Sequence, residues 1–116
     1  SEVIRGNVLA IPIDDSLLYV EPIYLRAETA AYPELRLVAV MQGDSLSYAE
    51  TFDEALLGLF EKSGTDSPGE ERLISELAVD ARRAFERYLQ ALGEQEFQEA
   101  AEALTRLSKI LDQMNR

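Results

Sequence analysis

The 116-residue chain contains no cysteine and no histidine, and these two absences exclude several classes of chemistry. Without cysteine there is no disulfide, no thiolate zinc site and no cysteine nucleophile. Without histidine there is no imidazole metal ligand and no Ser-His-Asp triad. The glycine-containing segment MQGDSLS has no lysine, so it lacks the parts of a phosphate-binding loop. We therefore predict no catalytic residue, no metal site and no bound cofactor.

Basic residues are also scarce: 11 Lys and Arg face 22 Asp and Glu, which gives a formal net charge of −11. No lysine- or arginine-rich stripe is present, so nucleic acid and anionic lipid surfaces are poor partners. The longest apolar runs, such as Val8 to Ile13, are far shorter than the roughly twenty residues of a membrane span. We predict a soluble chain with no direct membrane insertion. Because it starts at Ser1 without a leader, we expect it to be processed or part of something larger.

The first half of the chain has the composition of β-hairpins. In GNVLAIPIDDSLLYVEPIYLRAE, we predict strands at 8–13 and 17–25, joined by turn residues Asp14, Asp15 and Ser16. A second hairpin is predicted over 35–50, with Gly43 in its bend because glycine accepts a positive φ. Proline cannot donate a ladder hydrogen bond, so Pro12 and Pro22 are each expected at an edge or a bulge. Both faces of the first strands are apolar in places, which predicts a helix on one side and another layer or partner on the other.

Helical spacing follows the second hairpin. The segment TFDEALLGLFEK (51–62) begins with a capping box at Thr51 and Glu54, and its apolar stripe is expected to cover the sheet. We therefore predict an α+β protein in which 1–62 is a small antiparallel β-hairpin sheet covered by one helix. The polar stretch 63–71 is predicted to be a flexible linker in which Ser67 caps a helix that begins at Pro68.

An antiparallel helical hairpin is predicted for 72–116, with Gly93 ending the first helix. A lone helical pair buries little apolar surface, so we expect it to dock on the β unit or on another chain. The predicted contact positions repeat at threes and fours: Leu73, Ile74, Leu77, Ala81, Phe85, Tyr88 and Leu92 in the first helix, and Phe97, Ala101, Leu104, Leu107, Ser108, Leu111 and Met114 in the second.

Four groups of side chains are candidate sites. The Asp14-Asp15 pair is interpreted as a structural turn rather than an acid/base dyad or a calcium site, which would need more oxygen ligands. Glu21 precedes a proline in an apolar strand, so it is either buried with a perturbed pKa or, as we favour, directed to solvent at an edge. Arg82, Arg83 and Arg87 are expected to form ion pairs along or between the helices, the alternative being an anion site. Four tyrosines are expected to pack in the core or across strands, although they could instead line a groove: Tyr19, Tyr24, Tyr32 and Tyr48.

The sequence resembles a known family. The stretch GNVLAIPIDDSLLYVEPIYLRAE is similar to the signature of uncharacterised protein family 0182 (UPF0182), a group of large bacterial multi-pass membrane proteins. YPELRLVAVMQGDSLSYAETFDEALLGLF follows in the family's order, and Phe97 stands at the aromatic place of a Gly-Asp-Trp-like turn. The resemblance implies a C-terminal soluble domain, on the extracytoplasmic side of the cell membrane, in a protein whose activity is not established.

The leading hypothesis is therefore a non-catalytic domain that serves assembly or protein–protein contact. Its partner would be the remainder of the same membrane protein or another protein, through a surface formed by Leu17, Tyr19, Glu21, Ile23 and Tyr24. The alternatives are a carboxylate-dependent enzyme fragment or metal-binding domain that uses Asp14, Asp15 or Glu21, and a helical hairpin that recruits a partner helix.

Overall fold

The structure, a computed structural model, describes residues 2–14, 16–29, 32, 34–60 and 68–115. It is an α+β fold, as predicted. The strands are β1 (Glu2–Arg5), β2 (Leu9–Ile13), β3 (Ser16–Arg26), β4 (Glu34–Gln42) and β5 (Ser45–Ala49), and the helices are α1 (Phe52–Phe60), α2 (Pro68–Gly93) and α3 (Phe97–Met114). β1 was not predicted. The helix α2 begins at the expected Pro68, so 68–71 of the predicted linker are helical, while Ser67 and the rest of that linker lie outside the described residues.

The five strands form one antiparallel sheet around β3. β4 pairs along one side of β3 and continues to β5 through a two-residue turn, in which Gly43 has the expected positive φ of 58°. β1 and β2 lie end to end along the other side, where β1 pairs with residues 23–26 and β2 with residues 16–20. The sheet edge is therefore interrupted at residues 6–8.

The two prolines occupy different positions in this sheet. Pro12 is in the edge strand β2, as predicted, and its carbonyl oxygen points away from β3 to accept a hydrogen bond from Ser108 in α3. Pro22 is in the central strand and so not at an edge, but a register shift, the bulge that was the other predicted setting, follows it between Ile23 and Tyr24. Its carbonyl accepts a 2.8 Å bond from the Gly6 amide at the interruption between β1 and β2. The N–H and C=O groups of a strand residue point to the same side of the strand. The N–H that proline lacks would therefore point to the interruption between β1 and β2, where no strand needs it as a donor.

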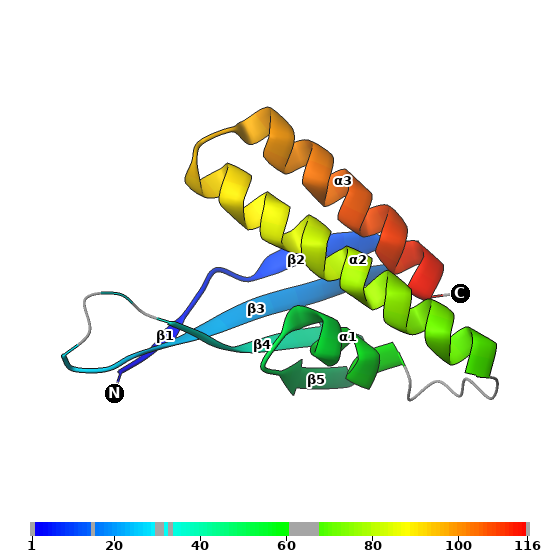
Figure 1. Cartoon of the computed structure of the whole chain (residues 1–116), viewed down its shortest axis with the longest axis horizontal. Helices are drawn as coiled ribbons and strands as arrows, with labels where there is room; N and C mark the ends of the chain where they lie inside the picture. Colours follow the sequence, from blue (N-terminus) through cyan, green and yellow to red (C-terminus); the bar gives the residue numbers. More distant parts are fainter. Residues whose placement is uncertain (1, 15, 30–31, 33, 61–67, 116) are drawn as a thin grey trace.

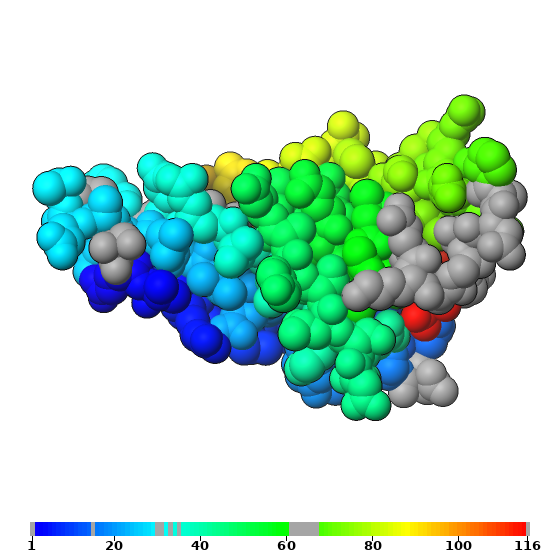
Figure 2. Space-filling view, turned by 90° about the horizontal axis from the view of Figure 1, so that it is seen from below, coloured from blue at the N-terminus to red at the C-terminus, as the bar shows by residue number. Residues whose placement is uncertain are grey.

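All three helices contribute to a core on one face of the sheet (Figure 1). Alternate strand residues such as Ile11, Val20 and Val40 are fully buried against them. The hairpin of α2 and α3 docks on this β unit, one of the two arrangements that the sequence allowed. Figure 2 shows α1, in green, between α2 and the hairpin of β4 and β5. The helical layer thus covers one face of the sheet, and no described residues cover the other face.

The contact surface between α2 and α3 differs from the predicted one. Leu73, Leu92, Phe97 and Ala101 were expected in it but are exposed, Phe97 by 65%. Five predicted positions are buried, namely Ala81, Phe85, Leu107, Leu111 and Met114, and the other buried positions are alanines that were not predicted: Ala78, Ala84 and Ala91 in α2, and Ala100 and Ala103 in α3. Small side chains let the two helices approach closely, which moves the larger residues to the flanks of the contact.

The helix α2 ends at Gly93, as predicted, but the turn that follows uses another residue for its left-handed conformation. Gly93 itself does not have a positive φ. Gln95 has the left-handed conformation instead, with φ 61°. The amide of Glu96 donates to the carbonyl of Ala91 and the amide of Gln95 to that of Leu92, which is the bonding pattern of a Schellman motif. The left-handed residue that follows α2 is therefore not a glycine.

Candidate interaction surface

The uncovered face of the sheet, called here the open sheet face, is rich in apolar side chains. Along β3, the odd-numbered residues alternate with the buried Leu18 and Val20 and so point away from the helices. The same alternation in β4 and β5 directs Met41 and Tyr48 to this side. Its exposed members are Val8, Leu17, Tyr19, Met41, Leu46 and Tyr48, and Ile23, Leu37 and Ala39 lie half-buried among them.

Cross-strand pairing makes these side chains contiguous. Tyr19 lies opposite Met41, which lies opposite Leu46 on the next strand. Tyr48 is opposite Ala39 and is 67% exposed. An antiparallel sheet with one wet face normally carries polar residues there, so a continuous apolar row across three strands indicates an interaction surface.

Two charged residues interrupt this face. Glu21 in β3 lies 3.7 Å from the guanidinium of Arg5 in β1, and its side chain is 26% exposed while that of Arg5 is 75% exposed. Glu21 lies in the central strand and not at an outer edge of the sheet, but it is paired only with Ala39 of β4, because neither β1 nor β2 pairs with this position. Beside Glu21 a shallow depression of about 190 Å³, called here the Glu21 depression, is lined by Val8, Tyr19, Ala39, Met41 and Leu46 among others.

Four of the five predicted partner residues lie on the open sheet face: Leu17, Tyr19, Glu21 and Ile23. Tyr24 points to the opposite side. It lines a groove of about 350 Å³ between α2 and the interrupted edge, together with Phe85, Tyr88 and Leu92. The period of two along β3 accounts for this difference, since Tyr24 shares the parity of Val20 and Pro22.

The other two tyrosines, Tyr32 and Tyr48, are exposed rather than packed in the core. Sequence reasoning missed several residues of the open sheet face. Val8, at the start of the first predicted strand, and Met41 and Leu46 of the second hairpin belong to it, and Arg5 is its cation. The signal was present in the second hairpin, where apolar residues occupy both parities of LRLVAVMQ.

Asp14 belongs to a structural turn, as interpreted from the sequence. It has φ 48°, and its amide donates a 2.7 Å bond to the carboxylate of Asp112 in α3. Its own carboxylate accepts from the side-chain amide of Asn115 at 3.3 Å. The turn thereby fastens the β2–β3 hairpin to the C-terminal end of α3. Asp15 lies outside the described residues.

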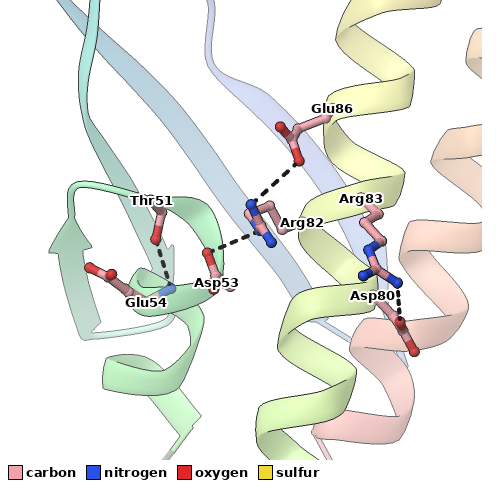
Figure 3. Close-up of polar contacts among 7 residues, drawn as sticks. All are labelled: Thr51, Asp53, Glu54, Asp80, Arg82, Arg83 and Glu86. Atoms are coloured by element: carbon pink, nitrogen blue, oxygen red, sulfur yellow. Dashed lines mark hydrogen bonds and ion pairs between the residues drawn. The ribbon is translucent and has the colours of Figure 1, made fainter.

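Arg82, Arg83 and Arg87 of α2 form the expected ion pairs, and those of Arg82 and Arg83 are shown in Figure 3. Arg82 bridges to Asp53 of α1 at 3.4 Å and to Glu86 at 3.9 Å, and Arg83 pairs with Asp80. Arg87 pairs with Glu96 and Glu99, which joins α2 to α3. The ion pairs of the cluster thus link α2 to α1 and to the start of α3. Figure 3 also shows the hydroxyl half of the capping box, in which the Glu54 amide lies 3.4 Å from the Thr51 oxygen.

Within the part of the chain that the structure describes, no group of three or more acidic side chains is placed to hold a metal ion. Asp14 and Glu21 also lie far apart. Five residues of extended strand separate Ser16 from Glu21, which corresponds to about 17 Å. None of the helices in the described ranges has both the length and the apolar character to cross a bilayer.

These features define an α+β domain with helices on one sheet face and an apolar surface on the other. Comparison with known proteins places it in a family. A "UPF0182 protein" of Pelotomaculum thermopropionicum is 36% identical over 98% of this chain, and one of Clostridium novyi is 36% identical over 99%. A third, from Bradyrhizobium diazoefficiens, is 45% identical over 79% of the chain. The chain belongs to the UPF0182 family.

The match covers only a small part of each relative. The chain spans 14%, 13% and 11% of the length of these three proteins. No family model matches the sequence, and no solved structure matches it. The family is of unknown function, so any role has to be argued from the surface itself.

Proposed function

We propose that the chain is a non-catalytic interaction domain of a larger UPF0182 protein, and that it contacts another layer of protein through the open sheet face. The observation that carries this proposal is the apolar row from Tyr19 through Met41 to Leu46, which lies on the sheet face opposite the core. Exposed apolar patches of this kind mark contact sites on proteins. The role is assembly of the larger protein or contact with a partner protein.

The position of the domain in the parent protein is part of the proposal. The family resemblance supports a C-terminal location in a multi-pass membrane protein, on the extracytoplasmic side. The net charge of −11 supports a place away from anionic lipid surfaces.

The placement of the carboxylates favours contact over chemistry. Acid/base catalysis needs groups that converge on one substrate atom, whereas the Asp14 turn and Glu21 are about 17 Å apart along β3. Asp14 is bonded to α3, and Glu21 is surrounded by apolar side chains. Neither forms a pair of the kind that an enzyme fragment would require.

Thiol labelling tests the proposal, because the chain has no cysteine of its own. We would introduce Tyr48→Cys on the open sheet face and Glu102→Cys on the exposed side of α3, each in the 116-residue chain and in the full-length protein that contains it. The alkylation rate at position 48 is expected to fall at least tenfold in the full-length protein, while the rate at position 102 stays within about twofold. Equal rates at position 48 in the two proteins, or equal protection at both positions, would refute a specific contact through this face.

A further inference from the structure

We infer that the occupant of the open sheet face is another segment of the same polypeptide, which places an apolar side chain in the Glu21 depression and a basic side chain against the Glu21 carboxylate. This inference rests on the proposed function and names the chemistry of its partner. It follows from the shape of the depression, from the Glu21 carboxylate whose cation is 3.7 Å away, and from the charge and length of the proteins concerned.

The depression selects an apolar anchor. Its volume of about 190 Å³ is of the order of one large side chain, and its walls are formed by aliphatic and aromatic groups such as Val8, Tyr19 and Met41. The depression lies along the apolar row, so a segment lying across the strands would reach it with one side chain. Contacts of this form concentrate binding energy on the anchor.

Glu21 adds a requirement for positive charge. Its carboxylate lines the depression, and its ion pair with Arg5 is 3.7 Å long, beyond hydrogen-bond distance. The Arg5 side chain is 75% exposed and that of Glu21 is 26% exposed, so the pair is open to solvent. A protein layer that covered the face would remove that solvent. Burial of a carboxylate is costly unless donors or cations replace the lost hydrogen bonds, so we infer that the covering segment adds a basic side chain to the distant Arg5.

A second copy of the chain is a poor candidate for this role. Each copy carries a net charge of −11, so two copies repel each other at close range. Packing face to face about a two-fold axis would bring two Glu21 and two Arg5 side chains to one interface, which adds no cation beyond the one that each Glu21 already has. A segment of different composition avoids the repulsion and can add a cation.

The relatives supply such a segment in the same chain. The aligned region is 13–14% of the first two relatives, so more than four fifths of each lies outside it. A segment joined to the domain by the chain meets it at an effective concentration in the millimolar range for a short flexible connection. A modest apolar contact with one ion pair is then sufficient to keep the face covered.

The decisive experiment uses the full-length protein carrying Tyr48→Cys, whose introduced thiol serves as a reporter. In this background we would compare Glu21→Lys, which repels a basic partner, with Glu21→Gln, which keeps the shape, and with Glu102→Lys as a control for the change in net charge. Glu21→Lys is expected to raise the labelling rate at position 48 about tenfold, Glu21→Gln less, and Glu102→Lys not at all. No change with Glu21→Lys would overturn the requirement for a basic side chain.

A photo-crosslinker attached to the thiol at position 48 then identifies the occupant. Mixed heavy- and light-isotope protein distinguishes the sources by mass: crosslinks within one polypeptide give only single-isotope pairs, whereas crosslinks between copies also give mixed pairs. Single-type crosslinks to a segment outside the 116 residues are the expected result. Mixed pairs, or crosslinks to a different protein, would overturn the inference but leave the proposed contact role standing. An unprotected thiol at position 48 in the labelling test would refute both.

Discussion

Gly6 is the position at which the close approach of the edge chain to β3 can be tested most directly. An added Cβ at this residue would lie 2.7 Å from Cγ of Pro22, 3.1 Å from the Pro22 carbonyl oxygen and 3.1 Å from the ring of Tyr24. Carbon atoms in favourable contact are about 3.5–4.0 Å apart, so the nearest pair would have to separate by about 1 Å. Glycine is therefore required at this position because there is no space for a Cβ atom. Its φ does not require glycine, since it is not in the left-handed region.

The cost of Gly6→Ala follows from how little the neighbours can move. Pro22 is buried in the central strand, its ring has no free rotation, and its carbonyl is held by the Gly6 amide. Overpacking of a well-packed site costs about 1–3 kcal/mol, and a rigid neighbour favours the upper part of that range. The loss of unfolded-state entropy on replacing glycine by alanine offsets about 0.4–1 kcal/mol. We expect a net loss of about 1–2 kcal/mol in the free energy of unfolding, or about 4–8 °C in Tm for a chain of this size.

Urea denaturation followed by circular dichroism measures this loss. The control is Gly93→Ala, since an added Cβ there meets no atom within 4 Å and a helix favours alanine, so its stability should be unchanged or higher. In a Pro22→Ala background the Cγ contact is absent, and the cost of Gly6→Ala should fall by about half of its value in the native background. A Gly6→Ala variant as stable as the native chain, or the same cost in both backgrounds, would refute the packing described at the interrupted edge.

Two further predictions concern the helical hairpin. Gln95→Gly should raise the free energy of unfolding by about 0.5–1 kcal/mol, because glycine adopts the left-handed conformation of this turn without the penalty of a side chain; a lower midpoint in urea would contradict it. Asp112→Ala should lower the free energy of unfolding by about 1 kcal/mol, because the Asp14 amide loses its acceptor, whereas Asp112→Asn keeps an oxygen there and should lose less. Equal losses for the alanine and asparagine variants would show that the hydrogen bond contributes nothing.

The sequence predicted the elements with strong local signals. The hairpin bend at Gly43, the start of α2 at Pro68 and the ion pairs within α2 each depend on residues close in the chain, and each is confirmed. Thr51 likewise caps α1 through its hydroxyl. Turn chemistry, capping and i,i+4 pairing are local physics, so one sequence is sufficient to read them.

Features that depend on distant residues were not predictable in the same way. β1 is a strand because it pairs with the end of β3, about twenty positions away, and nothing within EVIR signals that pairing. The tolerance of Pro22 in a central strand depends on an interruption of the edge chain at Gly6. The left-handed Gln95 was missed because Gly93, two residues earlier, has the stronger intrinsic preference for a helix end.

The candidate surface lies between these cases. The apolar character of both faces of the first hairpin was legible in the sequence, and it correctly indicated helical cover on one side. The sequence did not indicate which residues form the open sheet face, because Met41 and Leu46 join it through the register of neighbouring strands. The misplaced Tyr24 shows the same limit, since a list of neighbouring residues includes both parities of a strand.

The buried core and the apolar open sheet face are formed by different residues, and this separation is the strongest argument for the proposed docking role. The core on the helical face includes Ile11, Leu56 and Leu107, each fully buried, and ion pairs of Arg82 and Arg87 tie the three helices together. No residue of the open sheet face is among the buried residues of that core. Apolar residues that are exposed on a domain lower its solubility and favour non-specific association. Their presence across three adjacent strands therefore supports the proposed contact with a second layer of protein.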